Sequence, residues 1–138
     1  MSEWLKFPEV PGQFTCPNVF QAGVHSRSNA NIMARRYLVV ESDVLGRDEM
    51  KALLAWAAQF MRLRAVVDTA GRSLHGWFEV PTESAERELR VILPAMGCDP
   101  ALFKKSQPCR LPGAWRGEKR QRLLWLDEGG RREQVEAI

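Results

Sequence analysis

Four short apolar runs dominate the distribution of hydrophobic residues along the chain. Runs of this length, bounded by polar residues, glycine or proline, are typical of buried strands. We therefore expect strands at residues 35–41, 64–69, 74–80 and 120–127.

Two longer segments carry apolar residues at helical spacing. In residues 48–63 they recur every three or four positions, and Asp48 is suited to the N-cap. The second helix is expected to begin with Thr82 as its N-cap. Pro94 lies inside its apolar pattern and has no backbone N–H to donate, so we expect a break near residues 91–93.

The order of these elements is strand, helix, strand, strand, helix, strand. This order predicts an α+β fold of the split βαβ kind, also called ferredoxin-like or RRM-like: an antiparallel sheet with both helices on one face. In that arrangement the first and third strands are neighbours in the middle of the sheet. Side chains at the end of the first strand should then lie close to side chains on the third.

The whole chain, residues 1–138, is expected to form one domain. Residues 1–34 are expected to be an N-terminal arm, because prolines and glycines interrupt them, and their aromatic residues should pack the arm onto the core. Residues 35–127 form the predicted core. Residues 128–138 are charged, contain two adjacent glycines and are expected to form a flexible tail.

Charge and cysteine content narrow the class of protein. The formal net charge is +3 and the pI is near 9.0, which is compatible with nucleic-acid binding without requiring it. The three cysteines show no C-x-x-C spacing, which favours a reducing compartment. No apolar run reaches membrane-spanning length and no signal-peptide pattern is present, so we expect a cytoplasmic protein without a membrane partner.

Two carboxylates follow the first predicted strand. Glu41 and Asp43 are spaced i, i+2, so they project from the same face of an extended chain. Carboxylates held together repel each other unless a cation lies between them, and Mg²⁺ prefers carboxylate oxygens. The pair is a candidate metal site, although a polar turn after a strand is a common alternative.

A second candidate segment lies between the second and third strands. It contains Gly71, Arg72, Ser73 and His75 within five residues. Glycine allows a close backbone approach to a ligand, and the other side chains can bind phosphate oxygens. An ordinary hairpin turn would explain the same residues.

A proline- and glycine-containing loop, residues 107–116, carries Arg110 and Arg116, and Lys119 follows it. These cations are candidate phosphate ligands, and a basic surface loop is the alternative.

In this order, the three segments resemble the archaeo-eukaryotic primase superfamily, specifically the primase-polymerases of phages, plasmids and bacterial mobile elements. That superfamily carries an acidic pair after a strand, then Ser-x-His, then a third acid and often Arg-Leu-Pro-Gly. The matching residues are Glu41 and Asp43, Ser73 to His75, Asp99, and Arg110 to Gly113. Two departures are that Glu41 stands where many members have Asp, and that Asp99 follows Gly-Cys instead of an apolar strand.

The resemblance implies a metal-dependent nucleotidyltransferase that synthesises or extends primers on a DNA template. Its catalytic acids and metal ligands would be Glu41, Asp43 and Asp99, with two Mg²⁺ or Mn²⁺ ions. Its nucleotide-binding residues would be Arg72, Ser73, His75, Arg110, Arg116 and Lys119. The implied partners are a DNA template and primer, nucleoside triphosphates and a replicative helicase.

Three alternatives remain open at this stage. Asp127, at the end of the last predicted strand, is a rival for the third acid. An RRM-like module without catalysis would bind nucleotides or nucleic acid. A replication-initiator endonuclease would need a tyrosine nucleophile, and Tyr37, the only tyrosine, lies inside an apolar strand. The choice of ribo- or deoxyribonucleotides, and of priming or extension, is not determined by these patterns.

Overall fold

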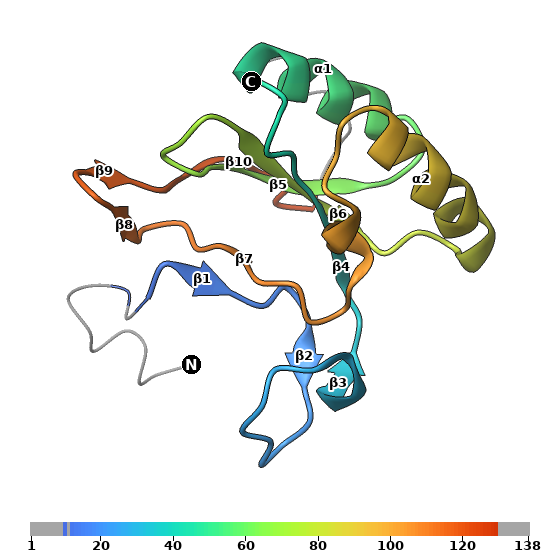
Figure 1. Ribbon diagram of the computed structural model, residues 1–138, viewed down its shortest axis with the longest axis vertical. Coiled ribbons are helices and arrows are strands. Elements are labelled where there is room, and N and C mark those ends of the chain that lie inside the picture. The colour runs from blue at the N-terminus through green and yellow to red at the C-terminus, as the bar shows by residue number, and fades with distance from the viewer. Residues whose placement is uncertain (1–9, 11, 130–138) are drawn as a thin grey trace.

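The computed structural model describes residue 10 and residues 12–129, and its main feature is a four-stranded antiparallel sheet (Figure 1). All four expected strands are present, and with two helices they give an α+β structure. The strand order is β10-β5-β6-β4. The bounds are Tyr37–Val40 for β4, Leu63–Asp68 for β5, Leu74–Glu79 for β6 and Arg122–Leu126 for β10.

The position of β4 differs from the expectation. It pairs with β6 as expected, but it lies at the edge of the sheet, and the central strands are β5 and β6. The reason is that β10 pairs with β5 and not with β4, and ionic contacts hold both ends of β10 there. Arg122 reaches Asp68 at 3.4 Å, and Asp127 lies 3.0 Å from Arg62.

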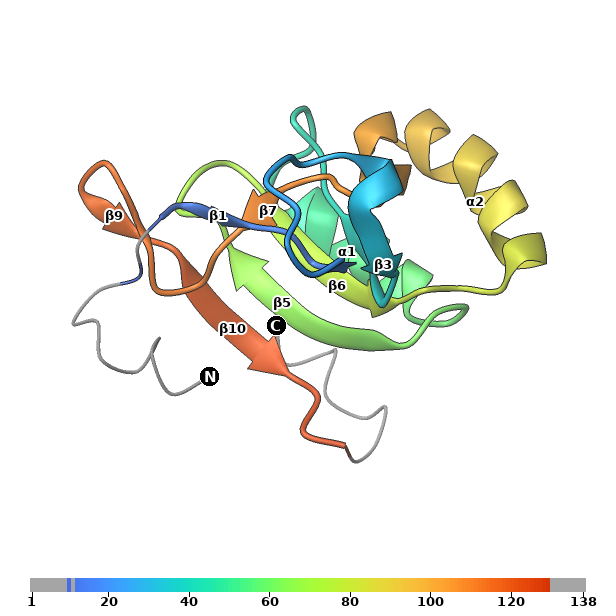
Figure 2. The ribbon, with the colours of Figure 1, turned by 90° about the horizontal axis from the view of Figure 1, so that it is seen from below.

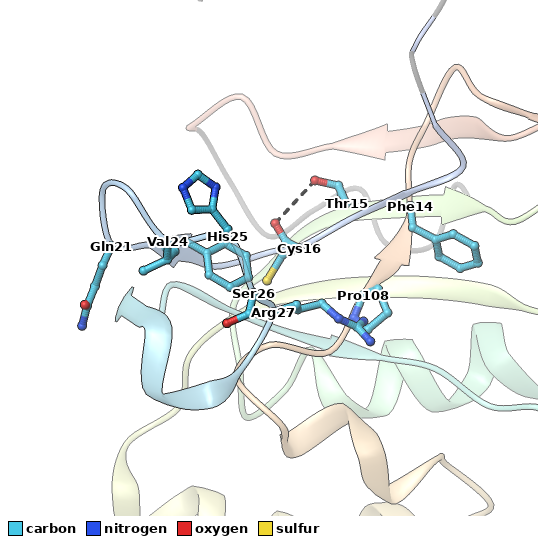
Figure 3. Close-up of a pocket in the computed structure, with 10 residues that line it drawn as sticks. Phe14, Thr15, Cys16, Gln21, Val24, His25, Ser26, Arg27 and Pro108 are labelled. Atoms are coloured by element: carbon cyan, nitrogen blue, oxygen red, sulfur yellow. Dashed lines mark hydrogen bonds between the residues drawn. The ribbon is translucent and has the colours of Figure 1, made fainter.

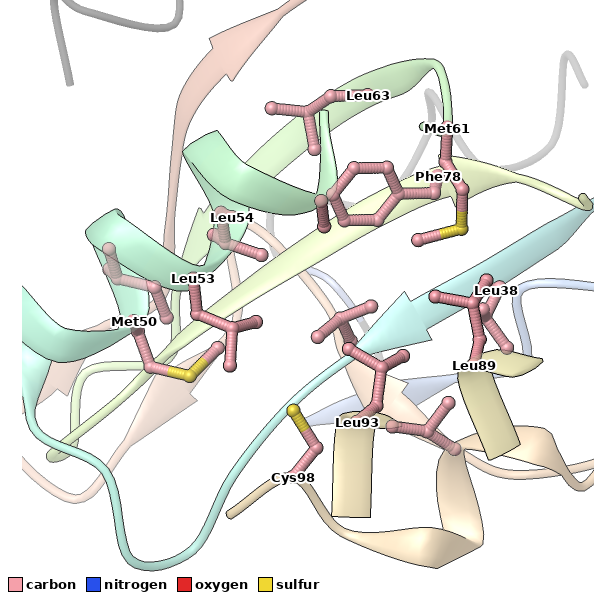
Figure 4. Close-up of a cluster of buried hydrophobic side chains, with 14 of the residues drawn as sticks. Leu38, Met50, Leu53, Leu54, Met61, Leu63, Phe78, Leu89, Leu93 and Cys98 are labelled. Carbon is pink, nitrogen blue, oxygen red and sulfur yellow. The ribbon is translucent and has the colours of Figure 1, made fainter. Parts of the chain in front are cut away.

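Two helices, α1 (Arg47–Ala57) and α2 (Glu83–Ala95), pack on one face of this sheet (Figures 1 and 2). Because side chains alternate along a strand, Leu38 and Val40 of β4 both point into this core. On β6, Gly76 leaves room for Leu54 of α1, which a Cβ atom at that position would strike. Figure 4 shows the resulting cluster of buried side chains between the helices and the strands.

The helix ends differ from the sequence expectation. Helix α1 has Gly46, not Asp48, at its N-cap, because the Glu49 carboxylate accepts a hydrogen bond from the Gly46 N–H at 2.7 Å. It ends at Ala57 and not at residue 63, since the following N–H groups of residues 59 and 60 bond three positions back and tighten the chain into a turn.

Helix α2 begins as expected. The Thr82 hydroxyl accepts a hydrogen bond from the Ala85 N–H at 3.3 Å. No break occurs near residues 91–93, and the helix continues through Pro94 to Ala95. Pro94 lies one residue before the end of the helix, so its missing N–H and the clash of its ring with the carbonyl four residues back affect only the last turn.

The remaining strands are two or three residues long and form three separate pairs: β1 with β7, β2 with β3, and β8 with β9. The arm therefore contains regular structure that its prolines did not indicate. The bounds are Phe14–Thr15 (β1), Val19–Phe20 (β2), Ile32–Ala34 (β3), Cys109–Arg110 (β7), Trp115–Arg116 (β8) and Lys119–Arg120 (β9), with short 3-10 helices at Asn29–Asn31 and Pro100–Phe103. The predicted tail lies largely outside the described residues.

The β1–β7 pair lies over the sheet face that the helices leave free (Figure 2). Thr15 and Pro112 line a cavity there together with Trp77 of the sheet. The fully buried Gln121 fixes this layer, because its amide donates to the carbonyl oxygens of Gln13 and Leu111 at 3.0 and 3.1 Å. The arm and the loop of residues 107–116 are thus held together beside the ends of β4 and β6.

Candidate active site

A pocket of about 360 Å³ lies where β4 ends and β6 begins, under the β1–β7 pair. It is polar and collects residues from five separate stretches of the chain. All the predicted site residues line it except Lys119, which lines a neighbouring cavity. The lining residues are Phe14, Glu41, Ser42, Asp43, Thr69, Arg72, Ser73, His75, Asp99, Gln107, Pro108, Arg110 and Arg116.

The centre of this pocket is a close contact between Glu41 and His75. The strand register pairs Val40 with Gly76, so the next residue of β4 and the preceding residue of β6 face each other on the side away from the helices. His75 Nε2 lies 3.0 Å from Glu41 Oε2. Both side chains are nearly buried, at 10% and 16% exposure.

The acidic pair is shaped by Ser42, which the sequence reasoning overlooked. Its buried hydroxyl donates to the Gly97 carbonyl oxygen and accepts from the N–H groups of Val44 and Leu45 at 3.2 and 3.0 Å. These hydrogen bonds fix the turn at Ser42. The residues on either side of it, Glu41 and Asp43, both line the pocket. A serine followed by a turn is the sequence signal that could have identified it.

Asp99 joins the pocket through backbone pairing. Its N–H donates to the Glu41 carbonyl oxygen at 3.0 Å, which brings the two residues side by side. One oxygen of its carboxylate accepts from the Ala101 N–H at 2.9 Å and caps the short helix at Pro100–Phe103. Asp127, the rival acid, lies at the opposite end of the sheet, bound to Arg62 and Arg64 at the start of β5.

The turn between β5 and β6 forms one wall. Its left-handed residue is Ala70, with φ of 57°, and not Gly71. Gly71 serves instead to admit Arg116, because a Cβ atom there would collide with the guanidinium. Arg116 Nη1 donates to the Thr69 carbonyl oxygen at 3.4 Å, and Thr69 Oγ1 donates to the Ser73 carbonyl oxygen at 2.8 Å.

The cations of the loop add positive charge to the pocket. Arg110 lies over the Phe14 ring, 4.1 Å from its centroid, and donates to Gln13 at 3.1 Å. Burial lowers the pKa of the Arg110 guanidinium, the nearby charge of Arg116 lowers it further, and Glu41 opposes both effects. Arginine remains charged at neutral pH in spite of such shifts. This wall therefore presents two close cations to an anionic ligand.

A thiol nucleophile is excluded at this site. Cys109 is buried behind the pocket and donates to the Thr15 carbonyl oxygen at 3.5 Å. Burial, followed by the negative charge of Glu41, raises the pKa of the Cys109 thiol far above its usual range. The reactive thiolate is therefore suppressed at neutral pH.

The acids fit a metal that is bound together with a ligand. Among residues 12–129, no group of three or more His, Cys, Asp or Glu side chains is arranged to hold a metal ion by itself. However, Mg²⁺ is usually held by one or two carboxylates plus the phosphates of a substrate. Glu41 and Asp43 supply that donor set in the same pocket as three arginines.

A second cavity, of about 700 Å³, adjoins the first (Figure 3). It lies between β1 and the segment of residues 20–27, and Phe14 and Pro108 line both cavities. Its wall is mostly apolar, and Gln21, His25 and Arg27 are among the residues that add polar groups to it. The candidate site thus continues into a larger hollow beside the arm.

Comparison with known proteins identifies no relative. No protein-family model matches the chain, no curated protein gives a significant match, and no solved structure does. Within the described residues, no helix is both long enough and apolar enough to cross a membrane.

Proposed function

We propose that the chain is a metal-dependent nucleotidyltransferase of the primase-polymerase kind, which joins nucleoside triphosphates on a nucleic-acid template. The observation that supports it is that one pocket collects three carboxylates and three arginines from segments far apart in the sequence. A site for anions alone gains nothing from carboxylates that face it, whereas a metal–triphosphate complex needs both kinds of charge.

Each group has a distinct role in this proposal. Glu41 and Asp43, with Asp99 beside them, would hold the divalent metal ions. Bound metal ions stabilise the attacking and leaving oxygens when a 3′-hydroxyl displaces pyrophosphate from the α-phosphate. Arg72, Arg110 and Arg116 bind the remaining phosphate charge through charge-assisted hydrogen bonds. His75 fixes the orientation of the Glu41 carboxylate and lies within the same pocket.

We further infer that the sheet is a variant of the split βαβ arrangement. Strands β4 and β5 are both antiparallel to β6, which lies between them, and α1 connects them. Strands β6 and β10 are separated in the same way by β5, with α2 as the connection. The last strand has joined the other edge, while the neighbouring pair that carries Glu41 and His75 is retained.

A nucleotide-binding module without catalysis is the second candidate. The observation in its favour is that two acids already have structural partners: Glu41 is bound by His75, and Asp99 caps a short helix. In this alternative, the arginines bind the phosphates and no metal is required.

A synthesis assay separates the two candidates. The wild-type chain is incubated with a primed or unprimed DNA template, labelled ribo- or deoxyribonucleotides, and Mg²⁺ or Mn²⁺. We expect metal-dependent product from the wild type, and none from Glu41→Gln or Asp43→Asn. Asp48→Asn, which removes an exposed acid of α1, is the matched control and should retain full activity.

Metal binding supplies a second measurement. Electron paramagnetic resonance of free Mn²⁺ should show little uptake by the protein alone, because the acids lack a three-ligand group. With a nucleoside triphosphate present, the protein should take up more Mn²⁺ than the triphosphate binds without protein. Nucleotide binding that is unchanged by metal, together with no synthesis, would establish the non-catalytic module.

A further inference from the structure

The hairpin formed by β8 and β9 concentrates the positive charge of the chain. The hairpin and the first residue of β10, Arg122, lie in residues 115–122, which contain four cations and one carboxylate. Their net charge of +3 equals the formal net charge of all 138 residues. The other residues therefore carry sixteen basic and sixteen acidic side chains. The hairpin projects at the end of the molecule away from α2 (Figures 1 and 2).

The pairing inside the hairpin brings like charges together. The register places Arg116 opposite Lys119, and both residues are exposed. Like charges directly opposite each other on paired strands are destabilising. Glu118, in the turn, is the one acid of this segment. A bound polyanion would offset the positive charge that this register concentrates.

A basic cavity of about 410 Å³ lies at the base of the hairpin. Lys119 and Arg120 line it with Arg47 and Arg122, and its one acid is Asp68. Arg47 and Arg122 both contact that carboxylate, at 3.0 and 3.4 Å, so its single charge faces two guanidinium groups. If the hairpin residues Arg116 and Glu118 are added, this end of the molecule carries five cations and two carboxylates.

This basic cavity and the candidate active site share one wall, the turn between β5 and β6. Ala70 and Gly71 line the basic cavity, whereas Thr69 and Arg72 line the active-site pocket. Arg116 bridges them, because it lines the pocket and its guanidinium lies against Gly71. A chain of phosphates that crosses this turn would pass directly from one cavity into the other.

We propose that the β8–β9 hairpin and its basic cavity bind the phosphate backbone of single-stranded nucleic acid and lead it to the candidate active site. Only the role of the bound nucleic acid as a template rests on the proposed function. Exposed Trp115 favours nucleic acid over an acidic protein: its ring lies 6.0 Å from the Arg120 guanidinium and is 48% exposed. Aromatic rings beside cations bind bases and phosphates together.

The test is binding of a fluorescently labelled oligo(dT) to the full chain, measured by anisotropy over a series of salt concentrations. Each phosphate contact on a single strand contributes about −0.7 to the slope of log K against log salt. Lys119→Gln with Arg120→Gln should therefore flatten the slope by about 1.4. Lys119→Glu alone should also weaken binding. Because Lys119 is exposed, this single variant should fold normally, and it therefore serves if the double variant does not fold.

Arg87→Gln with Lys104→Gln is the matched control, since it removes two exposed cations outside the hairpin and should leave the slope unchanged. Wild-type slopes in both hairpin variants, or equal competition by poly-glutamate and unlabelled oligo(dT), would overturn the inference. Hairpin-dependent binding without any nucleotide incorporation would support it and reject the proposed catalysis. Nucleotide incorporation together with wild-type slopes in the hairpin variants would support the proposed catalysis and reject the inference about the hairpin.

Discussion

His75 Nε2 and Glu41 Oε2 lie 3.0 Å apart, so the third strand of the sheet holds the first carboxylate of the acidic pair. The contact follows from the register of β4 and β6, which pairs Val40 with Gly76. It places the histidine of the Ser-x-His segment against this carboxylate. His75 and Gln107, whose Nε2 donates to Glu41 Oε1 at 3.5 Å, together hold this carboxylate.

The first prediction concerns His75. His75→Ala should raise the Kd for a nucleoside triphosphate about tenfold or more, because the loss of one charge-assisted hydrogen bond costs roughly 1.5–3 kcal/mol. His75→Gln, which retains a donor, should restore part of the affinity. Nucleotide titration by calorimetry measures both variants, and unchanged affinity in His75→Ala would reduce the segment to an ordinary hairpin.

The third acid gives a second prediction. Asp99→Asn retains an oxygen that can accept from the Ala101 N–H, so it removes the charge while the short helix keeps its cap. We expect it to lose synthesis with little change in the melting temperature. Asp127→Asn should show the opposite result, full synthesis and a lower melting temperature, because Asp127 binds Arg62 and Arg64 far from the pocket. Loss of synthesis in Asp127→Asn alone would move the site to the last strand.

Gly71 provides a third prediction. In Gly71→Ala, the new methyl group displaces the flexible guanidinium of Arg116 and should leave the backbone in place. Nucleotide affinity should then fall to the level of Arg116→Gln, with the melting temperature nearly unchanged. The double variant should be no weaker than either single variant, since both act on the same group. Additive losses of affinity would show that Gly71 acts through some other contact.

The sequence predicted the strands and the polar pocket because short-range patterns determine both. Alternation along β4 places Leu38 and Val40 in the core, and so places Glu41 on the other face. Once β4 and β6 are neighbours, the residue after Val40 must meet the residue before Gly76. The Glu41–His75 pair could therefore be predicted from two facts: side chains alternate along a strand, and β4 is the neighbour of β6.

The rest depends on contacts between distant residues that no local pattern encodes. The attachment of β10 to β5 is held by Arg122 with Asp68 at one end of the pair and by Asp127 with Arg62 at the other. The arm is fixed by Gln121, a residue type that is usually exposed and here is fully buried. Only the folded chain shows which of many polar residues find such partners.

The last prediction concerns stability and pH at the junction of the arm and α2. Glu86 accepts from Arg35 at 2.5 Å and from Arg90 at 2.6 Å, and Arg35 and Glu86 are nearly buried. Burial acts to raise the pKa of Glu86, but the hydrogen bonds and charges of Arg35 and Arg90 outweigh it and hold the pKa below its usual 4.5. The ionised carboxylate is thus favoured by folding, and its stabilising contribution is complete at neutral pH.

Glu86→Gln should therefore lower the free energy of unfolding at pH 7 by about 2–3 kcal/mol, since a nearly buried Arg35 loses its counter-charge. Because the folded-state pKa is depressed, the difference between wild type and variant should shrink as the pH falls below 4.5 and through the folded-state pKa. Arg90→Gln is the control: its guanidinium is 51% exposed, so its loss should cost less than about 1 kcal/mol. Urea unfolding at several pH values measures all three proteins. A gap between wild type and Glu86→Gln that stays constant into strong acid would show that Glu86 stabilises the fold by packing and not by its charge.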